Sequence, residues 1–378
     1  MVFVIGTLSV LQRKAKGSYS IAMKVISIGL DASILDAGSA VRKRMVALAE
    51  KAGAITVFVP AVSDTTDEVS EHLTIHSVCG IKPLQLLKLW QLISQELRVT
   101  TYDLITVQDT YFIGFLAVQL GKKFSIPVEV QVHGLEQFSG FRKWIAGFVI
   151  RRADRIRVVS ERLKRELDSR FKIQDSRMYI LPVYTQIEIP ERTTKRKTVP
   201  YPFTFLTVGR LVSVKNIALQ IRAFAKLAKM VPHIQLRIVG DGPLKEVLKA
   251  EVRSLDLQDQ IIFEGYQTEV NRFYEEADAF LLTSDSEGWG RVVLEAAAHR
   301  LPIIMTNVGL AQEVIKNEES GLIIPVGDEG ELVLAMRELL DKPELRTRLA
   351  EGACKAFKSL PSREEHIRKQ VEQWAGFK

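Results

Sequence analysis

The chain has 378 residues, of which 47% are hydrophobic and 26% are charged. This composition is typical of a soluble globular protein with room for two domains, and it excludes disordered and fibrous classes. The formal net charge of +7 is compatible with nucleic acid, anionic lipid or phosphorylated ligands as partners. Only the distribution of the charges along the chain can distinguish these three kinds of partner.

Several features favour a cytoplasmic location. The two cysteines, Cys79 and Cys354, lie far apart without metal-ligand spacing, so we expect neither a disulfide scaffold nor a zinc site. No apolar run reaches the ~18 residues that a membrane-spanning helix requires. Residues 1–22 carry cations after their apolar stretch, the reverse of a secretory signal, and we expect them to be an appended segment outside the fold.

The first part of the chain alternates apolar strands with helical segments. Strands are predicted at 25–29, 55–59, 104–107, 128–132, 155–159 and 179–182, and helices at 39–51 and 84–97. Within the second helix, four apolar residues recur at helical spacing and are predicted to be core: Leu86, Leu87, Trp90 and Ile93. The repetition predicts a doubly wound, Rossmann-like α/β domain over residues 23–184.

A basic segment at residues 141–165 contains nine Lys or Arg residues against two acids. Apolar side chains such as Trp144 and Phe148 are interleaved with the cations. Two interpretations remain open: the segment lies on an anionic membrane surface, or it is a solvated helix whose apolar residues pack on the core.

A polar, proline-bounded stretch at 185–202 predicts a linker. A second strand and helix series follows, with strands predicted at 204–208, 235–239, 261–263, 279–282, 303–305 and 322–324. It predicts a second doubly wound domain over residues 203–360, with a helix in the remaining segment, 361–378. Two such domains with facing carboxyl edges would form one cleft, where open α/β sheets bind ligands.

The loop after the first strand of the second domain carries two cations. The strand ends at Gly209 and a helix is predicted to start near Asn216, which leaves Arg210 and Lys215 on the connection. Arginine binds phosphate through a planar fork, and lysine binds it as a point charge. A further loop, Gly-Asp-Gly-Pro at 240–243, lacks the G-x-G-x-x-G pattern and disfavours a nicotinamide-dependent dehydrogenase.

Two carboxylates flank a glycine-rich turn in residues 284–295, Ser-Asp-Ser-Glu-Gly-Trp-Gly-Arg-Val-Val-Leu-Glu. The carboxylates are Glu287 and Glu295, and Gly288 and Gly290 allow a ligand to approach the backbone closely. Amides at the start of the helix predicted at 292–298 can face a phosphate, and a carboxylate can accept hydrogen bonds from two adjacent hydroxyls. The combination predicts a site for a sugar nucleotide.

The 284–295 string resembles the E-x7-E signature of the retaining glycosyltransferases typified by sucrose, glycogen and mannosyl transferases, glycosyltransferase family 4. The Gly-Arg-Leu and Lys-Asn elements within 209–216 and the turn containing Gly242 resemble the same family. The resemblance implies the two-domain GT-B architecture, in which the first domain binds the acceptor and the second binds the nucleotide sugar.

The resemblance also implies roles for the matched residues. Glu295 would hold the ribose hydroxyls, and Glu287 with the backbone of 288–290 would hold the transferred sugar. Arg210 and Lys215 would neutralise the leaving diphosphate. The remaining donor-site residues would be Gly209, Gly242, Trp289, Val292 and Tyr266, the last beside the nucleotide base, although an ordinary half-buried tyrosine fits its position equally well.

In the first domain the resemblance is carried by two loops. His133 follows a predicted strand where the family has a histidine, and it would contact the transferred sugar or the leaving group as a catalytic residue. Gly38 lies in a loop, 36–42, that resembles the family's glycine loop over the donor phosphates, although relatives usually have paired glycines there. In the second domain, the loop 305–315 ends near Glu313 like its counterpart but has Gly309-Leu310 where many relatives have two glycines.

The resemblance implies a retaining hexosyltransferase that uses a UDP- or GDP-linked donor and a saccharide or lipid-linked acceptor, in cell-surface polysaccharide or glycolipid synthesis. We expect no cofactor and no metal, because no Asp-x-Asp motif is placed for a divalent ion, and no nucleic acid partner. The expected location is the cytoplasm. A further hypothesis is peripheral contact with the inner face of an anionic membrane. The alternatives are a non-catalytic subunit that binds sugar nucleotides and a sugar-nucleotide epimerase of the same architecture.

Overall fold

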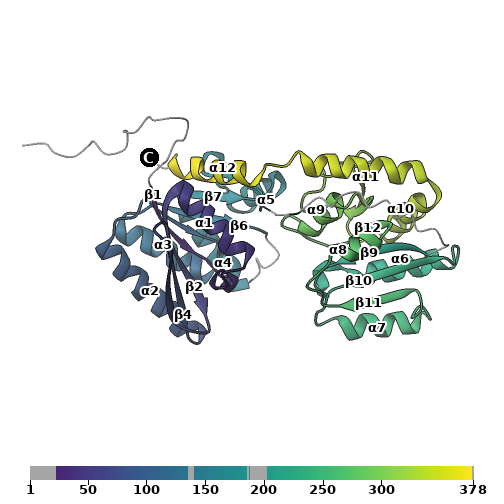
Figure 1. The fold of residues 1–378 in the computed structure, drawn as a ribbon, viewed down its shortest axis with the longest axis horizontal. Coiled ribbons are helices and arrows are strands. Elements are labelled where there is room, and N and C mark those ends of the chain that lie inside the picture. The colour runs from purple at the N-terminus through teal and green to yellow at the C-terminus, as the bar shows by residue number, and fades with distance from the viewer. Residues whose placement is uncertain (1–22, 135–139, 185–186, 188–201, 377–378) are drawn as a thin grey trace, which may run out of the picture. The chain divides into compact units, whose positions relative to one another are not determined.

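A computed structural model describes residues 23–134, 140–184, 187 and 202–376. The chain divides into two compact units, each built around its own sheet (Figure 1). The first unit comprises Met1–Val159, Lys164–Leu181 and Ser362–Lys378, and the second comprises Ser160–Leu163 and Pro182–Pro361. The expected appendage, 1–22, and nearly all of the expected linker, 185–202, lie outside the described residues.

The first unit contains an eight-stranded sheet in the order β3-β4-β2-β1-β5-β6-β7-β8. Neighbouring strands are parallel except for the pair β3 and β4. The six predicted strands are all present, which confirms the doubly wound fold. The strands are β1 (Met23–Ile28), β2 (Gly53–Ala61), β3 (Thr65–Ser70), β4 (Leu73–Cys79), β5 (Leu104–Val107), β6 (Val128–Val132), β7 (Arg155–Val158) and β8 (Met178–Ile180).

The helices of the first unit are α1 (Ala40–Ala52), α2 (Lys82–Val99), α3 (Phe112–Phe124), α4 (Gly140–Arg152), most of α5 (Glu161–Phe171) and α12 (Arg363–Ala375). Helix α3 lies between α2 and α4 and contacts both. The predicted core stripe of α2 is wrong at Leu87, which is 53% exposed. Ile93 is buried as predicted, Leu86 and Trp90 are half-buried, and Leu89 and Leu97 are buried outside the predicted stripe. None of the helices within the described ranges has the length and apolar character needed to cross a membrane.

Helix α12 completes the core of the first unit, although it follows the whole second unit in the chain. Ile367, Val371 and Trp374 pack in one cluster with residues of β1, β2 and α1. The Trp374 indole also donates to the fully buried carboxylate of Glu129 on β6, at 3.1 Å to each oxygen. Because a buried carboxylate is costly without hydrogen-bond donors, this contact ties α12 to the sheet.

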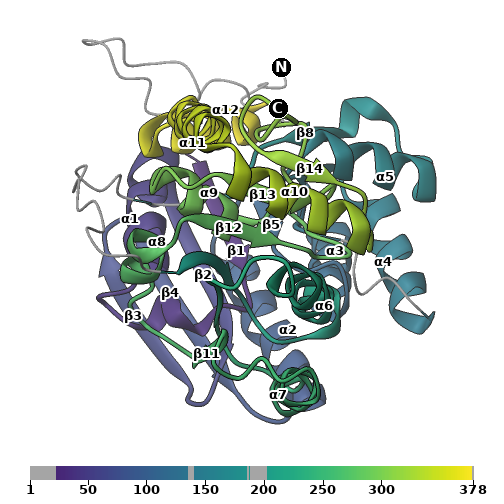
Figure 2. The same ribbon diagram turned by 90° about the vertical axis from the view of Figure 1, so that its right-hand side faces the viewer.

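The second unit contains a six-stranded parallel sheet in the order β11-β10-β9-β12-β13-β14. Strands β11, β12, β13 and β14 of this sheet are labelled in Figure 2. All six predicted strands are present. They are β9 (Phe203–Val208), β10 (Ile234–Val239), β11 (Ile261–Gly265), β12 (Ala279–Leu282), β13 (Ile303–Thr306) and β14 (Leu322–Ile324). The chain leaves β9 toward β10 and β11 and later resumes on the other side at β12. The loops after β9 and β12 therefore diverge at a topological switch point, where doubly wound sheets bind ligands.

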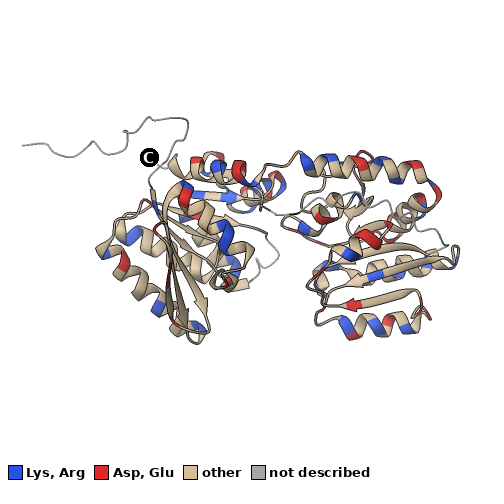
Figure 3. Cartoon of the chain, in the orientation of Figure 1, with Lys and Arg blue, Asp and Glu red and all other residues tan. Residues whose placement is uncertain are grey.

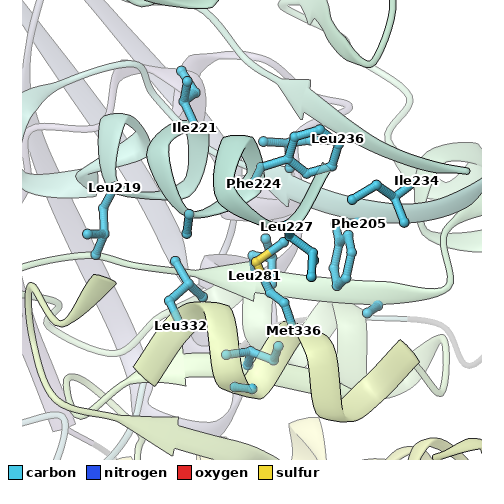
Figure 4. Close-up of a cluster of buried hydrophobic side chains, with 14 of the residues drawn as sticks. Phe205, Leu219, Ile221, Phe224, Leu227, Ile234, Leu236, Leu281, Leu332 and Met336 are labelled. Atoms are coloured by element: carbon cyan, nitrogen blue, oxygen red, sulfur yellow. The ribbon is translucent and has the colours of Figure 1, made fainter. Parts of the chain in front are cut away.

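The helices of the second unit are α6 (Ile217–Ala228), α7 (Lys245–Ser254), α8 (Asn271–Glu276), α9 (Arg291–Ala298), α10 (Glu329–Asp341) and α11 (Pro343–Lys358). Helix α6 packs beside α10, and α9 packs beside α11. Phe205, Phe224 and Met336 are fully buried between α6, α10 and the sheet (Figure 4). Truncating such an aromatic to alanine costs about 3–5 kcal/mol, so this core fixes the strands that carry the site.

Candidate functional site

The loops after β9 and β12 bring together two of the residues singled out from the sequence. The Lys215 ammonium, at the end of a short 3-10 turn (Ser213–Lys215), forms an ion pair with Oε1 of Glu287. The two side chains are only 21% and 11% exposed, so solvent screens the pair weakly. A cation and a carboxylate thus meet at the carboxyl edge of the sheet.

Hydrogen bonds from neighbouring strands hold the Glu287 loop in place. Ser284 Oγ donates to Glu287 Oε1 at 2.7 Å, and Ser284 itself is buried. Thr306 Oγ1, at the end of β13, donates to the Ser284 carbonyl at 2.7 Å. The Asp285 amide donates to the Val214 carbonyl at 2.8 Å, which fastens the β12 loop to the β9 loop. These hydrogen bonds therefore hold the Glu287 carboxylate at a fixed position.

Glu295 lies on α9, whose first residue follows Gly290. Gly290 has a φ of 92°, a conformation that L side chains rarely adopt, which explains a glycine at this helix start. The buried Tyr274 hydroxyl of α8 donates to Glu295 Oε2 at 2.8 Å, and the Tyr274 ring stacks on His299. Burial, with the negative charge of Glu295, raises the pKa of Tyr274 well above its usual value. The tyrosine therefore remains a hydrogen-bond donor that orients the carboxylate.

A close backbone contact joins the glycine loop after β10 to the loop that carries Arg210. A Cβ on Gly240 would lie 1.9 Å from the Gly209 carbonyl oxygen, and one on Gly242 would lie 2.5 Å from that of Leu211. The Leu211 amide donates to the Asp241 carbonyl at 2.9 Å. Gly242 is thus required by packing between loops, independently of any ligand, while Arg210 projects as an exposed cation.

The other predicted donor-site residues differ in accessibility. Trp289 is 6% exposed and its indole nitrogen has no hydrogen-bond partner, so a ligand would meet its backbone rather than its ring. Gly288 and Val292 are half-buried beside it. Tyr266 follows β11 and is 76% exposed, which excludes an ordinary half-buried tyrosine.

Gly38 and His133 both lie at the carboxyl edge of the first sheet, after β1 and β6. Gly38 has ordinary space around it, and its amide donates to Asp36 Oδ1 at 2.9 Å, so no backbone strain demands a glycine there. The His133 ring is exposed, and partial loss of hydration with the positive charges of Arg157 and Arg44 lowers its pKa. Both residues belong to the first unit, whereas Glu287 and Glu295 belong to the second.

Sequence reasoning missed the residues that support the two glutamates. Tyr274 lies in a six-residue helix without a distinctive pattern, and Thr306 is the last residue of an otherwise apolar strand. Ser284 stands inside the quoted string, where its spacing of three from Glu287 was the available signal. Among the residues that the structure describes, no three His, Cys, Asp or Glu side chains are grouped for metal binding.

The two units and this loop arrangement define a GT-B protein, and comparison with known families agrees. The model for glycosyl transferases group 1 matches residues 189–356, and the model for glycosyltransferase family 4 matches residues 41–183. The chain belongs to the group 1, family 4 glycosyltransferases, as the resemblance in the sequence predicted.

Individual relatives match over limited stretches. A lipopolysaccharide core glycosyltransferase, LpsD of Rhizobium meliloti, is 34% identical over 42% of this chain and 45% of its own length. The alpha-D-kanosaminyltransferase of Streptomyces kanamyceticus is 23% identical over 69% of this chain and 72% of its own. The chain spans about half the length of most of the curated relatives it matches.

Solved structures share the fold over nearly the whole chain. Sucrose-phosphate synthase from Thermosynechococcus elongatus superposes with a TM-score of 0.79 at 20% identity, over 94% of this chain and 99% of its own. The HepE protein of Anabaena, solved with UDP, superposes with a TM-score of 0.76 at 16% identity, over 94% of this chain and all of its own. The GT-B architecture is thereby confirmed.

Proposed function

We propose that this protein is a retaining glycosyltransferase that transfers a hexose-type sugar from a nucleotide-diphosphate donor. The supporting observation is the meeting of Lys215 and Glu287 at the switch point between β9 and β12, within a chain of the group 1, family 4 glycosyltransferases. We assign Glu295 to the ribose hydroxyls, and Glu287 with the 288–290 backbone to the transferred sugar.

In this proposal, catalysis is electrostatic stabilisation of the leaving group. The bond from the anomeric carbon to the diphosphate oxygen breaks, and a bond to the acceptor oxygen forms on the same face. The acceptor proton passes to an oxygen of the departing phosphate, while Arg210 and Lys215 balance the negative charge that develops there. His133 contacts the transferred sugar or the leaving group from the first unit. Metal independence remains a prediction.

The nature of both substrates is inferred from chemistry and relatives. HepE of Anabaena has been solved with UDP and with UDP-glucose, which favours a UDP-linked donor over a GDP-linked one. The relatives include lipopolysaccharide core glycosyltransferases and the alpha-monoglucosyldiacylglycerol synthase of Streptococcus pneumoniae, which favour a saccharide or lipid-linked acceptor. We place the reaction in the cytoplasm, in cell-surface polysaccharide or glycolipid synthesis.

The test is binding and release of nucleoside diphosphate across a panel of UDP-, GDP- and ADP-sugars. Glu295→Ala and Arg210→Ala are expected to weaken binding of the preferred donor by about tenfold or more, the cost of losing one charged hydrogen-bond partner. Matched changes on the remote helix α10, Glu338→Ala and Arg337→Ala, are expected to leave it unchanged.

Each alternative has its own outcome. Donor binding without release of nucleoside diphosphate, with any acceptor supplied, would indicate a non-catalytic sugar-nucleotide subunit. A changed sugar formed without an acceptor would indicate an epimerase. If no sugar nucleotide binds at any pH or salt concentration, the donor-site proposal is wrong.

A further inference from the structure

Two neighbouring helices of the first unit expose large aromatic side chains in their first turns. Phe112 and Phe115 on α3 are 48% and 36% exposed, and Phe141 and Trp144 on α4 are 68% and 63% exposed. Each helix follows a strand of a parallel sheet, so these first turns lie at the carboxyl edge of that sheet.

The rings form one connected strip. The ring centroids of Phe141 and Trp144 are 5.9 Å apart, those of Trp144 and Phe148 are 6.2 Å apart, and those of Phe148 and Phe115 are 5.2 Å apart. A contiguous exposed apolar surface is uncommon on a protein that has no use for it. This aromatic strip, formed by Phe115, Phe141, Trp144 and the half-buried Phe148, is therefore a candidate contact surface.

A groove between α4 and α5 adjoins the strip and is lined by cations. Its volume is about 460 Å³, and its lining includes Trp144 and Phe148 together with Lys143, Arg151, Arg152 and Arg170. Among the residues that the structure describes, no carboxylate lines the groove; the Glu166 carboxylate pairs with Arg170 from outside the lining. The Arg152 guanidinium lies 3.8 Å from the Phe148 ring centroid, so charge and aromatic surface are in direct contact.

The basic surface continues beyond this groove. A second hollow of about 620 Å³ shares Arg151 and Arg170 and adds Lys172 and Arg177. The Arg177 guanidinium also donates to main-chain oxygens at the end of α4, which fixes its position. The Lys and Arg residues are drawn in blue in Figure 3. The two hollows suit several anionic groups beside an apolar surface.

We propose that this face docks on an anionic lipid bilayer, with the aromatic strip in the interfacial layer and the grooves on lipid phosphates. Aromatic rings favour the membrane interface, and Lys and Arg are attracted to anionic headgroups. Of the two interpretations of residues 141–165, packing on the core applies to Ile145 and Ile150, which are buried. It does not apply to Phe141 and Trp144, which are more than half exposed.

The docking surface extends the proposed function without depending on it. If the acceptor is lipid-linked, docking at the carboxyl edge of the first sheet presents the acceptor's sugar to the side of the sheet that carries His133 and Gly38. The surface itself is inferred from the first unit alone. Vesicle binding and donor binding therefore fail or succeed independently.

The experiment is flotation of the full chain with vesicles of neutral phosphatidylcholine, with and without one third phosphatidylglycerol, at low and at high salt. Wild type is expected to float with the anionic vesicles at low salt and to be released at high salt. The double variant Phe141→Ala, Trp144→Ala and the triple variant Lys143→Gln, Arg151→Gln, Arg152→Gln are each expected to bind about tenfold more weakly.

Matched controls come from α10 of the second unit and from Lys342, the residue that directly follows it. Leu334, 62% exposed, serves as the apolar control with Leu334→Ala, and Arg337→Gln with Lys342→Gln serves as the charge control. Both are expected to bind like wild type. Unchanged thermal unfolding of every variant establishes that the substituted side chains act at the surface.

Three results would overturn the proposal. Wild type that does not float with anionic vesicles at low salt has no such surface. Aromatic and charge variants that float like wild type place the contact elsewhere. Binding to heparin or DNA that exceeds vesicle binding and ignores the aromatic variant indicates a polyanion surface instead of a membrane surface.

Discussion

Tyr274 positions a carboxylate that the proposed function assigns to the donor's ribose. Its hydroxyl is 2.8 Å from Glu295 Oε2, and its ring is buried. Tyr274→Phe removes the hydrogen bond without opening a cavity. We expect the KM for the donor to rise about tenfold, since a hydrogen bond to a charged group contributes about 1.5–3 kcal/mol, with a smaller change in kcat.

Tyr102 supplies the matched control for that measurement. Its hydroxyl donates to the Glu96 carboxylate at 2.7 Å in the first unit, a bond of the same kind away from the candidate site. Tyr102→Phe is expected to leave the donor KM unchanged. An equal rise in the donor KM for Tyr274→Phe and Tyr102→Phe would show that Tyr274 acts only on stability.

Lys215 and Glu287 form an ion pair with each other, so a ligand that binds either side chain must compete with an internal partner. Glu287→Gln removes the competitor for the Lys215 ammonium. We expect free nucleoside diphosphate to bind about fivefold more tightly, which corresponds to about 1 kcal/mol for a partly shielded pair. Sugar transfer is expected to fall sharply in the same variant, because the sugar loses its carboxylate.

Isothermal titration with UDP and GDP measures the first effect, and product formation measures the second. Glu329→Gln breaks a comparable pair with Lys226 and Arg222 on the helices of the same unit. The Glu329→Gln variant is expected to change neither diphosphate binding nor product formation. Weaker diphosphate binding by Glu287→Gln would show that the ion pair organises the site instead of competing with the ligand.

At the scale of elements, two glycines in adjacent loops differ in the reason for which a glycine is needed, which is packing at one position and ligand access at the other. Gly240 has a φ of 137° and no space for a Cβ, whereas a Cβ on Gly209 would meet nothing within 4 Å. Gly240→Ala is expected to lower the free energy of unfolding of the second unit by about 1–3 kcal/mol and to weaken donor binding, because it displaces the Arg210 loop. Gly209→Ala is expected to weaken donor binding alone.

Thermal unfolding and donor titration on both variants separate these effects. Gly330→Ala is the control, because its Cβ would have ordinary contact in the first turn of α10. A Gly209→Ala protein that binds donor like wild type would remove close backbone approach at this position from the proposal.

The elements that could be predicted are those whose own sequence carries the pattern. Buried parallel strands are continuous apolar runs, so all six strands of the second sheet were identified. Strand β3 carries Asp67 and Glu68 on the edge of the sheet and pairs only with β4, so its polar sequence gave no signal. Leu87 was misplaced because helical spacing identifies an apolar stripe but not which part of it the sheet covers.

The sequence predicted the glutamates and cations of the candidate site, but not the residues that hold the glutamates in place by hydrogen bonds. Glycine spacing and the strand before it located Glu287 and Glu295. The contacts of Tyr274 and Thr306 depend on which strands become neighbours, a tertiary property that local sequence does not encode.

At the scale of the whole molecule, a buried histidine on α12 links stability to pH. His366 is 5% exposed, and burial with the nearby positive charges of Arg157, Arg44 and Lys369 lowers its pKa to about 3. The unfolded chain binds a proton at this position below about pH 6.5, whereas the folded chain does not. Stability from the neutral ring is therefore present above pH 6.5 and is lost as pH falls toward 3.

We expect His366→Gln to remove about 2 kcal/mol of the stability difference between pH 7.5 and pH 5. Denaturant unfolding at the two pH values, with hydrogen exchange on β6 and β7 to follow the first unit, measures it. His233→Gln, an exposed histidine of the second unit, is expected to leave the pH dependence unchanged. An identical pH dependence for wild type and His366→Gln would exclude this group as the source.

Because Trp374 and its neighbours on α12 belong to the core of the first unit, synthesis and folding follow different orders in this protein. A ribosome makes the strands of the first sheet early, but the helix that covers Glu129 emerges only after about 180 further residues have been added. The second unit can therefore complete its fold while the core of the first unit is still incomplete. The nascent first unit is thus the part of the chain that would most need a chaperone, because a chain that has emerged from the ribosome only as far as residue 361 would hold a complete second unit and an incomplete first unit.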